Sequence, residues 1–140
     1  MTIDVAGRKQ ALRMAEQLRE DTAVISITSP EEPDAVFPDD PHIRGIFRIR
    51  CTDLTSETDE EGLPYGRPLP KEEDFFGLKT FVDALFCARL IVHCHEGTSR
   101  SPAVARAVYE YRGCRDTLRM GDSAGENRLV YALACRELGI

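Results

Sequence analysis

Apolar residues recur at two spacings along this chain, and the alternation predicts strands separated by helices. Short runs rich in β-branched residues predict strands at 23–28, 43–51 and 90–92. Apolar positions three and four residues apart predict helices at 6–19, 70–86, 101–111 and 125–138. This order is typical of a largely parallel sheet with helices on both faces, so the expected fold class is α/β, with a functional site at the carboxyl end of a strand.

The length of 140 residues suits one domain, and we expect residues 1–140 to form it. The longest connection, Leu54–Leu69, is acidic at residues 57–61 and contains prolines. Connections longer than about 12 residues are usually functional or disordered. Two interpretations stay open, a solvated acidic excursion and a mobile flap that carries a catalytic acid.

Composition and charge narrow the class of protein. A hydrophobic content of 42% and a charged content of 30% are ordinary for a soluble globular protein. The net charge of −6 argues against a nucleic-acid-binding or membrane-binding surface. The polar opening Met1–Lys9 is unlike a signal peptide, and no apolar run approaches the roughly 18 residues that a membrane span needs. We therefore expect neither nucleic acid nor membrane as a partner.

The cysteines form an odd set without the spacing of a disulfide scaffold: Cys51, Cys87, Cys94, Cys114 and Cys135. Free thiols in a reducing compartment are the simplest interpretation, so we expect a cytoplasmic location. Cys51, Cys87 and Cys135 stand among apolar neighbours and are expected to be small buried hydrophobes. A regulatory disulfide to Cys94 stays open, because the sequence selects no partner for it.

The candidate chemistry lies in residues 91–102, Ile-Val-His-Cys-His-Glu-Gly-Thr-Ser-Arg-Ser-Pro. The loop Cys94–Arg100 joins a predicted strand to a predicted helix, and Pro102 suits a first helical turn. Backbone amides of such a loop can turn inward and bind an anion, reinforced by the positive end of the helix. Gly97 supplies the conformational freedom that the arc needs. The loop therefore predicts a phosphate cradle formed by His95, Glu96, Gly97, Thr98, Ser99 and Arg100.

Four side chains give this cradle a reaction. The helix terminus and a neighbouring cation favour the thiolate of Cys94, which attacks phosphorus without a separate base. The planar guanidinium of Arg100 holds two phosphate oxygens and stabilises the transition state. Ser101 is expected to hydrogen-bond the sulfur and help it leave when water cleaves the phosphocysteine. His93 is expected to order the loop rather than act as a base.

These residues resemble the signature of the cysteine-dependent tyrosine and dual-specificity phosphatases, His-Cys-x-x-Gly-x-x-Arg-Ser/Thr. His93, Cys94, Gly97, Arg100 and Ser101 match every fixed position, and chance gives such a match on the order of once in ten thousand chains of this length. A looser resemblance, to small bacterial and phage-type tyrosine-phosphatase-like proteins, extends over most of the chain. The resemblance implies a single phosphotyrosine-phosphatase-like domain, a phosphocysteine intermediate, no metal and no cofactor.

The resemblance also implies a general acid, an aspartate just after a strand upstream of the signature. Asp53 directly follows the predicted strand 43–51 and is the first candidate. Asp59 is the second, and Glu60 and Glu61 stay open. Such an acid contributes about 10²–10⁴ in rate by protonating the leaving oxygen. The alternative for Asp53 is a turn-capping role without chemistry.

The sequence thus predicts a phosphoric monoester hydrolase, a protein phosphatase whose partner is a phosphotyrosine protein or peptide, with phosphoserine and phosphothreonine open. The chain has no tryptophan, so it lacks the Trp-Pro-Asp flap of large tyrosine phosphatases. The alternative is a phosphate-recognition module of the same fold with little turnover. We expect no zinc site at His93, Cys94, His95 and Cys87, because no second Cys/His pair with finger spacing accompanies them.

Overall fold

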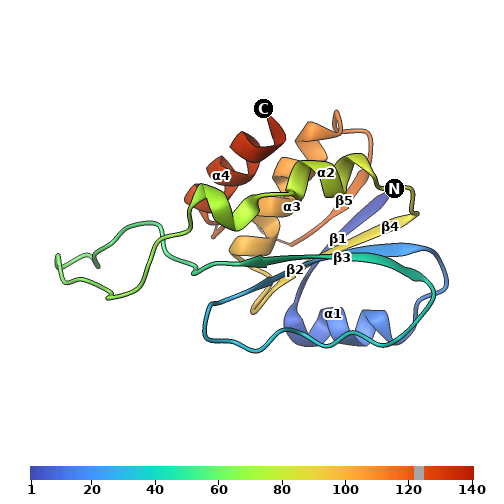
Figure 1. Ribbon diagram of the computed structural model, residues 1–140, viewed down its shortest axis with the longest axis horizontal. Helices are drawn as coiled ribbons and strands as arrows, with labels where there is room; N and C mark the ends of the chain where they lie inside the picture. The colour runs from blue at the N-terminus through green and yellow to red at the C-terminus, as the bar shows by residue number, and fades with distance from the viewer. Residues whose placement is uncertain (122–124) are drawn as a thin grey trace.

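The computed structural model describes residues 1–121 and 125–140, in which five parallel strands form a single sheet (Figure 1). The strands, in the spatial order β3-β2-β4-β1-β5, are β1 Thr2–Gly7, β2 Thr22–Thr28, β3 Ile43–Arg50, β4 Arg89–Cys94 and β5 Thr117–Arg119. The helices are α1 Arg8–Ala15, the 3₁₀ helix η1 Glu72–Phe75, α2 Leu78–Asp83, α3 Arg100–Tyr111 and α4 Arg128–Leu138. The predicted α/β class with a parallel sheet is confirmed.

Helices cover both faces of the sheet, also as predicted. α1 lies on one face, and α2, α3 and α4 lie on the other (Figure 1). Ala11 of α1 packs with Val24 and Ile91 in a small core, whereas the larger core joins the strands to α2, α3 and α4. β2 is buried at every position, because it lies inside the sheet with cover on both sides. None of the helices in the described ranges is long and apolar enough to cross a bilayer.

The beginning of the chain differs from the prediction. β1 occupies Thr2–Gly7, a stretch in which we predicted no strand, and α1 covers only Arg8–Ala15 of the helix predicted at 6–19. Asp4 gives this stretch its polar character, but its carboxylate accepts hydrogen bonds from Arg89 of β4 (2.7 Å) and Arg119 of β5 (2.6 Å). A buried charge paired in this way is compatible with an interior strand.

Two helices also differ from their predicted bounds. The segment predicted as one helix from Pro70 is η1 followed by α2, and Gly77 between them has a φ of +96°, a left-handed conformation that interrupts the helix. The last helix begins at Arg128, because the side chain of Asn127 accepts a hydrogen bond from the backbone N–H of Val130 and caps it there. β5 was not predicted, since three residues are too few to show a period.

The carboxyl ends of β2, β3 and β4 meet at one edge of the sheet. The parallel register aligns Ser26 with His93 and Ile27 with Ile49. The residues that follow these three strands therefore adjoin one another, as expected for a site in a parallel sheet.

Candidate active site

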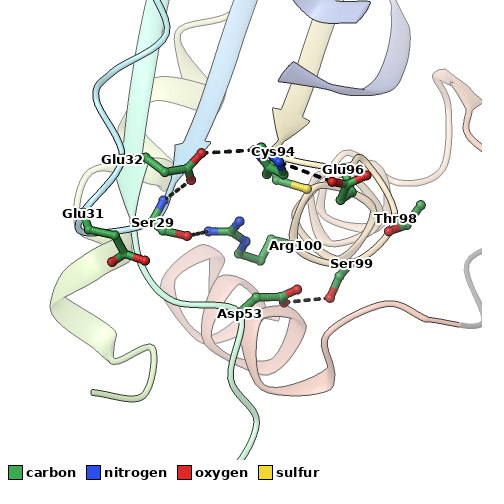
Figure 2. A pocket seen from close by; sticks show the side chains of 10 residues that line it. Ser29, Glu31, Glu32, Asp53, Cys94, Glu96, Thr98, Ser99 and Arg100 are labelled. Atoms are coloured by element: carbon green, nitrogen blue, oxygen red, sulfur yellow. Dashed lines mark hydrogen bonds and ion pairs between the residues drawn. The ribbon is translucent and has the colours of Figure 1, made fainter. Parts of the chain in front are cut away.

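A cavity of about 370 Å³ opens at this edge of the sheet, and the loops after β2, β3 and β4 all line it (Figure 2). Its lining residues are Ser29, Glu31 and Glu32 after β2, Asp53 after β3, and Cys94, His95, Glu96, Thr98, Ser99 and Arg100 at and after the end of β4. The structure thus brings the predicted nucleophile, the predicted arginine and the first candidate acid to one cavity. Gly97, Ser101 and His93 adjoin these residues in the sequence, but they are not among the described residues that line the cavity.

The loop Cys94–Arg100 is seated on the turn between β1 and α1. Gly97 has a φ of +80°, and a Cβ added there would lie 2.4 Å from the backbone nitrogen of Gly7. The backbone N–H of Arg8 donates to the carbonyl oxygen of His95 at 3.0 Å. Gly97 therefore serves two needs, a left-handed backbone and a close approach of two chain segments.

Cys94 is the last residue of β4, and its buried sulfur lies among hydrogen-bond donors. The backbone N–H of Gly97 donates to Sγ at 3.3 Å, and the hydroxyl of Ser101 lies 3.1 Å from Sγ. Ser101 is fully buried on the first turn of α3, so its hydroxyl is held beside the sulfur. Hydrogen-bond donors at these positions stabilise negative charge on the sulfur of Cys94.

Arg100 is the first residue of α3, and its side chain is only 4% exposed. Nη1 donates to the carbonyl oxygen of Cys51 at 2.8 Å and to Oγ of Ser29 at 3.0 Å. Nε is buried and has no hydrogen-bond partner among the described residues. A buried donor without a partner costs about 1–3 kcal/mol of stability. An oxyanion in the cavity that Arg100 lines would give the guanidinium an acceptor, so the site is suited to such a ligand.

His93 is fully buried behind the cavity. Its Nε2 lies 2.7 Å from Oγ of Ser26, and its Nδ1 lies 3.2 Å from the carbonyl oxygen of Cys94. Desolvation lowers the pKa of His93 below its ordinary value of 6.5, so the ring is neutral at neutral pH. The ring therefore orders the junction of β2 and β4 and does not face the cavity.

Asp53 lines the cavity and is fixed by two neighbours. Its Oδ1 accepts a hydrogen bond from the hydroxyl of Ser99 at 2.7 Å and another from Nδ2 of Asn127 at 2.9 Å. Asn127 was not predicted as a site residue, because an asparagine just before a helix reads only as a helix cap. The hydrogen bond from Asn127 to Asp53 spans 74 positions of sequence, so no local sequence pattern indicates it.

The other candidate acids lie on a projecting arm, residues 54–69 (Figure 1). Oδ1 of Asp59 accepts hydrogen bonds from the backbone N–H groups of Glu61 and Leu63, each at 2.9 Å, and so caps the turn at the tip. Asp59, Glu60 and Glu61 are not among the described residues that line the cavity. At the base of the arm, the hydroxyl of Thr52 donates to the carbonyl oxygen of Pro68 at 2.7 Å, which holds the two ends together.

The loop after β2 forms a wall that the sequence analysis did not single out. Glu32 accepts a hydrogen bond from the backbone N–H of Ser29 at 2.7 Å, and its other oxygen lies 3.2 Å from Nδ1 of His95. Burial opposes the shift, but the hydrogen bonds from Ser29 lower the pKa of Glu32 below 4.5. Arg50 of β3 donates to the carbonyl oxygens of Ser29 (2.9 Å) and Glu32 (2.8 Å), which fixes this wall.

The cysteines differ in exposure. All five are free thiols, with Cys51 buried, Cys114 exposed, and Cys87 and Cys135 between these extremes. Burial raises the pKa of Cys51 to about 12, so this thiol stays protonated. Within residues 1–121 and 125–140, no group of three or more His, Cys, Asp or Glu side chains could hold a metal ion.

Comparison of the chain with models of known protein families, with curated proteins and with solved structures gives no match.

Proposed function

We propose that this chain is a cysteine-dependent phosphoric monoester hydrolase that acts on phosphotyrosine in proteins or peptides. One observation carries the proposal: Cys94 lines a cavity together with the almost fully buried guanidinium of Arg100. A sulfur nucleophile beside a fixed guanidinium is the combination that phosphoryl transfer through a phosphocysteine requires. The resemblance of residues 93–101 to the phosphatase signature supports the same chemistry.

In the first step, the thiolate of Cys94 attacks phosphorus, and an Sγ–P bond forms as the bond to the leaving oxygen breaks. Arg100 and the backbone N–H groups of the loop bind the non-bridging oxygens, where charge is greatest in the transition state. Asp53 gives its proton to the leaving oxygen. The products of this step are a phosphocysteine, the dephosphorylated tyrosine and the carboxylate of Asp53.

In the second step, water attacks the phosphocysteine and the Sγ–P bond breaks. The carboxylate of Asp53 takes a proton from the water, which restores the acid for the next cycle. Ser101, 3.1 Å from Sγ, donates a hydrogen bond to the sulfur as it leaves with the bonding electrons. Inorganic phosphate is released, and water is the only co-reactant.

A phosphate-recognition module with little turnover is the second candidate function. The observation that favours it is the position of Asp53, because two donors already occupy Oδ1 of the candidate acid that lines the cavity. A module of this kind would bind a phosphopeptide through Arg100 and the loop amides without releasing phosphate.

Hydrolysis of p-nitrophenyl phosphate and of a phosphotyrosine peptide tests the two candidates. We expect vanadate-sensitive hydrolysis that is lost in Cys94→Ser and kept in Cys114→Ser, which changes an exposed thiol away from the cavity lining. Phosphoserine and phosphothreonine peptides measured beside them define the range of substrates. Tight binding of phosphopeptide without phosphate release would favour the module. If the protein neither bound nor hydrolysed the phosphopeptide, both functions would be rejected.

A further inference from the structure

We infer that Asn127 is a positioning residue that fixes the acidic proton of Asp53 on Oδ2. This inference rests on the proposed function, in which Asp53 is the general acid. It adds a residue outside the phosphatase-like signature to the reaction, and it identifies which of the two carboxyl oxygens delivers the proton.

Asn127 connects three parts of the site. It is 2% exposed, and its backbone N–H donates to the carbonyl oxygen of Ser99 in the loop at 3.1 Å. Its Nδ2 donates to Oδ1 of Asp53 at 2.9 Å and to the carbonyl oxygen of Leu54 at 3.2 Å. Its Oδ1 accepts from the backbone N–H of Val130 at 3.0 Å, at the start of α4. One buried residue thus joins the loop Cys94–Arg100 through its backbone, and the candidate acid and a helix through its side chain.

The orientation of the Asn127 amide follows from its partners. The backbone N–H of Val130 requires an acceptor, and the carbonyl oxygen of Leu54 requires a donor. Reversing the amide would put two donors together at Val130 and two acceptors together at Leu54. The group that meets Asp53 is therefore the NH₂, which only donates.

A donor that cannot accept decides where Asp53 carries its proton. If the proton were on Oδ1, it would occupy one of the two positions at which that oxygen accepts, and the N–H of Asn127 would face either the O–H itself or the weakly accepting oxygen of a carboxylic O–H. The hydrogen bond from Asn127 therefore favours the proton on Oδ2. Ser99 alone does not impose this choice, because a hydroxyl both donates and accepts. Oδ2 has no hydrogen-bond partner within the part of the chain that the structure describes, and Asp53 lines the cavity. The proton is consequently held on the oxygen that is available to the leaving group.

The consequence depends on the leaving group. A phenolate leaves as a strong base and needs the proton, whereas p-nitrophenolate leaves almost unaided. Asn127→Ser keeps a side chain that caps α4 but removes the amide donor to Asp53. We expect kcat/KM for phenyl phosphate to fall about 10- to 100-fold in this variant, with a change of less than about threefold for p-nitrophenyl phosphate.

Two further variants isolate the effect. Asn127→Ala removes both the helix cap and the donor, so it should lower the melting temperature relative to Asn127→Ser and show the same loss of phenyl phosphate turnover. Asp53→Asn removes the acid itself. In that background, Asn127→Ser should change the turnover of phenyl phosphate by less than about twofold, because the residue acts through Asp53.

The outcomes separate this inference from the proposed function. Equal losses for the two esters in Asn127→Ser, or a further large loss in the Asp53→Asn background, would overturn the positioning role while leaving a Cys94-dependent phosphatase. A wild-type protein with no Cys94-dependent hydrolysis of either ester would overturn the enzyme and this inference together.

Discussion

Nη1 of Arg100 donates to the carbonyl oxygen of Cys51 at 2.8 Å, and this contact joins the start of α3 to the residue that follows β3. The same nitrogen donates to the hydroxyl of Ser29, directly after β2. The guanidinium is thereby fixed by the fold itself. In the proposed function, an anion would meet an arginine that is already ordered, which reduces the loss of side-chain freedom that commonly opposes binding.

We predict that Arg100→Lys lowers kcat/KM for p-nitrophenyl phosphate about 10²- to 10³-fold, because an ammonium keeps the charge but cannot bind two oxygens in a plane. Inhibition by vanadate should weaken in parallel. Steady-state kinetics measure both effects, and Arg136→Lys on the exposed surface of α4 is the matched control. Near-wild-type turnover in Arg100→Lys would exclude the proposed role of the guanidinium.

Ser101→Ala should slow the second step more than the first. Without a donor 3.1 Å from Sγ, the thiolate is a poorer leaving group, and we expect kcat to fall about 10- to 100-fold. The phosphocysteine should then accumulate, so that stopped-flow mixing with p-nitrophenyl phosphate gives a burst of one equivalent of p-nitrophenol. An unchanged kcat without a burst would show that Ser101 does not assist the sulfur.

Thiol labelling should distinguish the cysteines of the folded protein. Iodoacetamide at pH 7 is expected to modify Cys94 and the exposed Cys114, whereas Cys51 resists because burial raises its pKa to about 12. Vanadate should protect Cys94 and leave Cys114 reactive, as read by peptide mass spectrometry. Equal protection of the two thiols, or labelling of Cys51 before Cys94, would contradict the proposed anion site.

A pair of glycine substitutions should separate backbone conformation from close approach. Gly97 and Gly62 have similar φ values of +80° and +82°, but an added Cβ meets Gly7 at 2.4 Å in the first case and nothing within 4 Å in the second. We expect Gly62→Ala to cost about 1–2 kcal/mol and Gly97→Ala to cost at least about 2 kcal/mol more. Urea unfolding measures the difference, and similar costs would argue against the seating of the loop on the β1–α1 turn.

The fold should lose stability as the pH falls below about 6.5. Burial lowers the pKa of His93, so the unfolded chain binds a proton that the folded chain excludes, and the unfolding free energy decreases as the pH drops from 6.5 toward the lower folded pKa. The lowered pKa values of Asp4, Glu32 and Asp116 act only near and below pH 4.5. Urea titrations at pH 5–7 should show a slope that His93→Gln removes, and an unchanged slope would exclude His93 as its source.

Much of the loop Cys94–Arg100 and of the elements that flank it was predictable because their determinants are local. The β-branched run before Cys94, the glycine at 97 and the apolar spacing after Ser101 each act within a few residues, and the structure has β4, a left-handed glycine and α3 at these places. Asp53 was chosen because the resemblance implies an aspartate soon after a strand, and it lines the cavity shortly after the end of β3. Its role as an acid stays a prediction.

What the sequence did not reveal depends on partners that are distant along the chain. Asp4 is compatible with a buried strand only because Arg89 and Arg119 pair with it, and neither arginine is near it in sequence. Glu32 lines the cavity because Arg50, 18 residues later, fixes its loop. Asn127 meets Asp53 in a structure in which α4 packs against α3. Neither the spacing of apolar residues nor the amino-acid composition indicates which residues distant in sequence come into contact.

The hydrogen bond from Thr52 to the carbonyl oxygen of Pro68 joins the two ends of the arm, residues 54–69, at its base. Because the two ends are joined there, we expect the number of residues between them to have little effect on the spacing of those ends. Peptides of other lengths and sequences should then be able to replace the tip, between residues 58 and 64, with Asp53 kept in place. The arm is thus the segment near the candidate active site at which we would insert a recognition tag or a reporter.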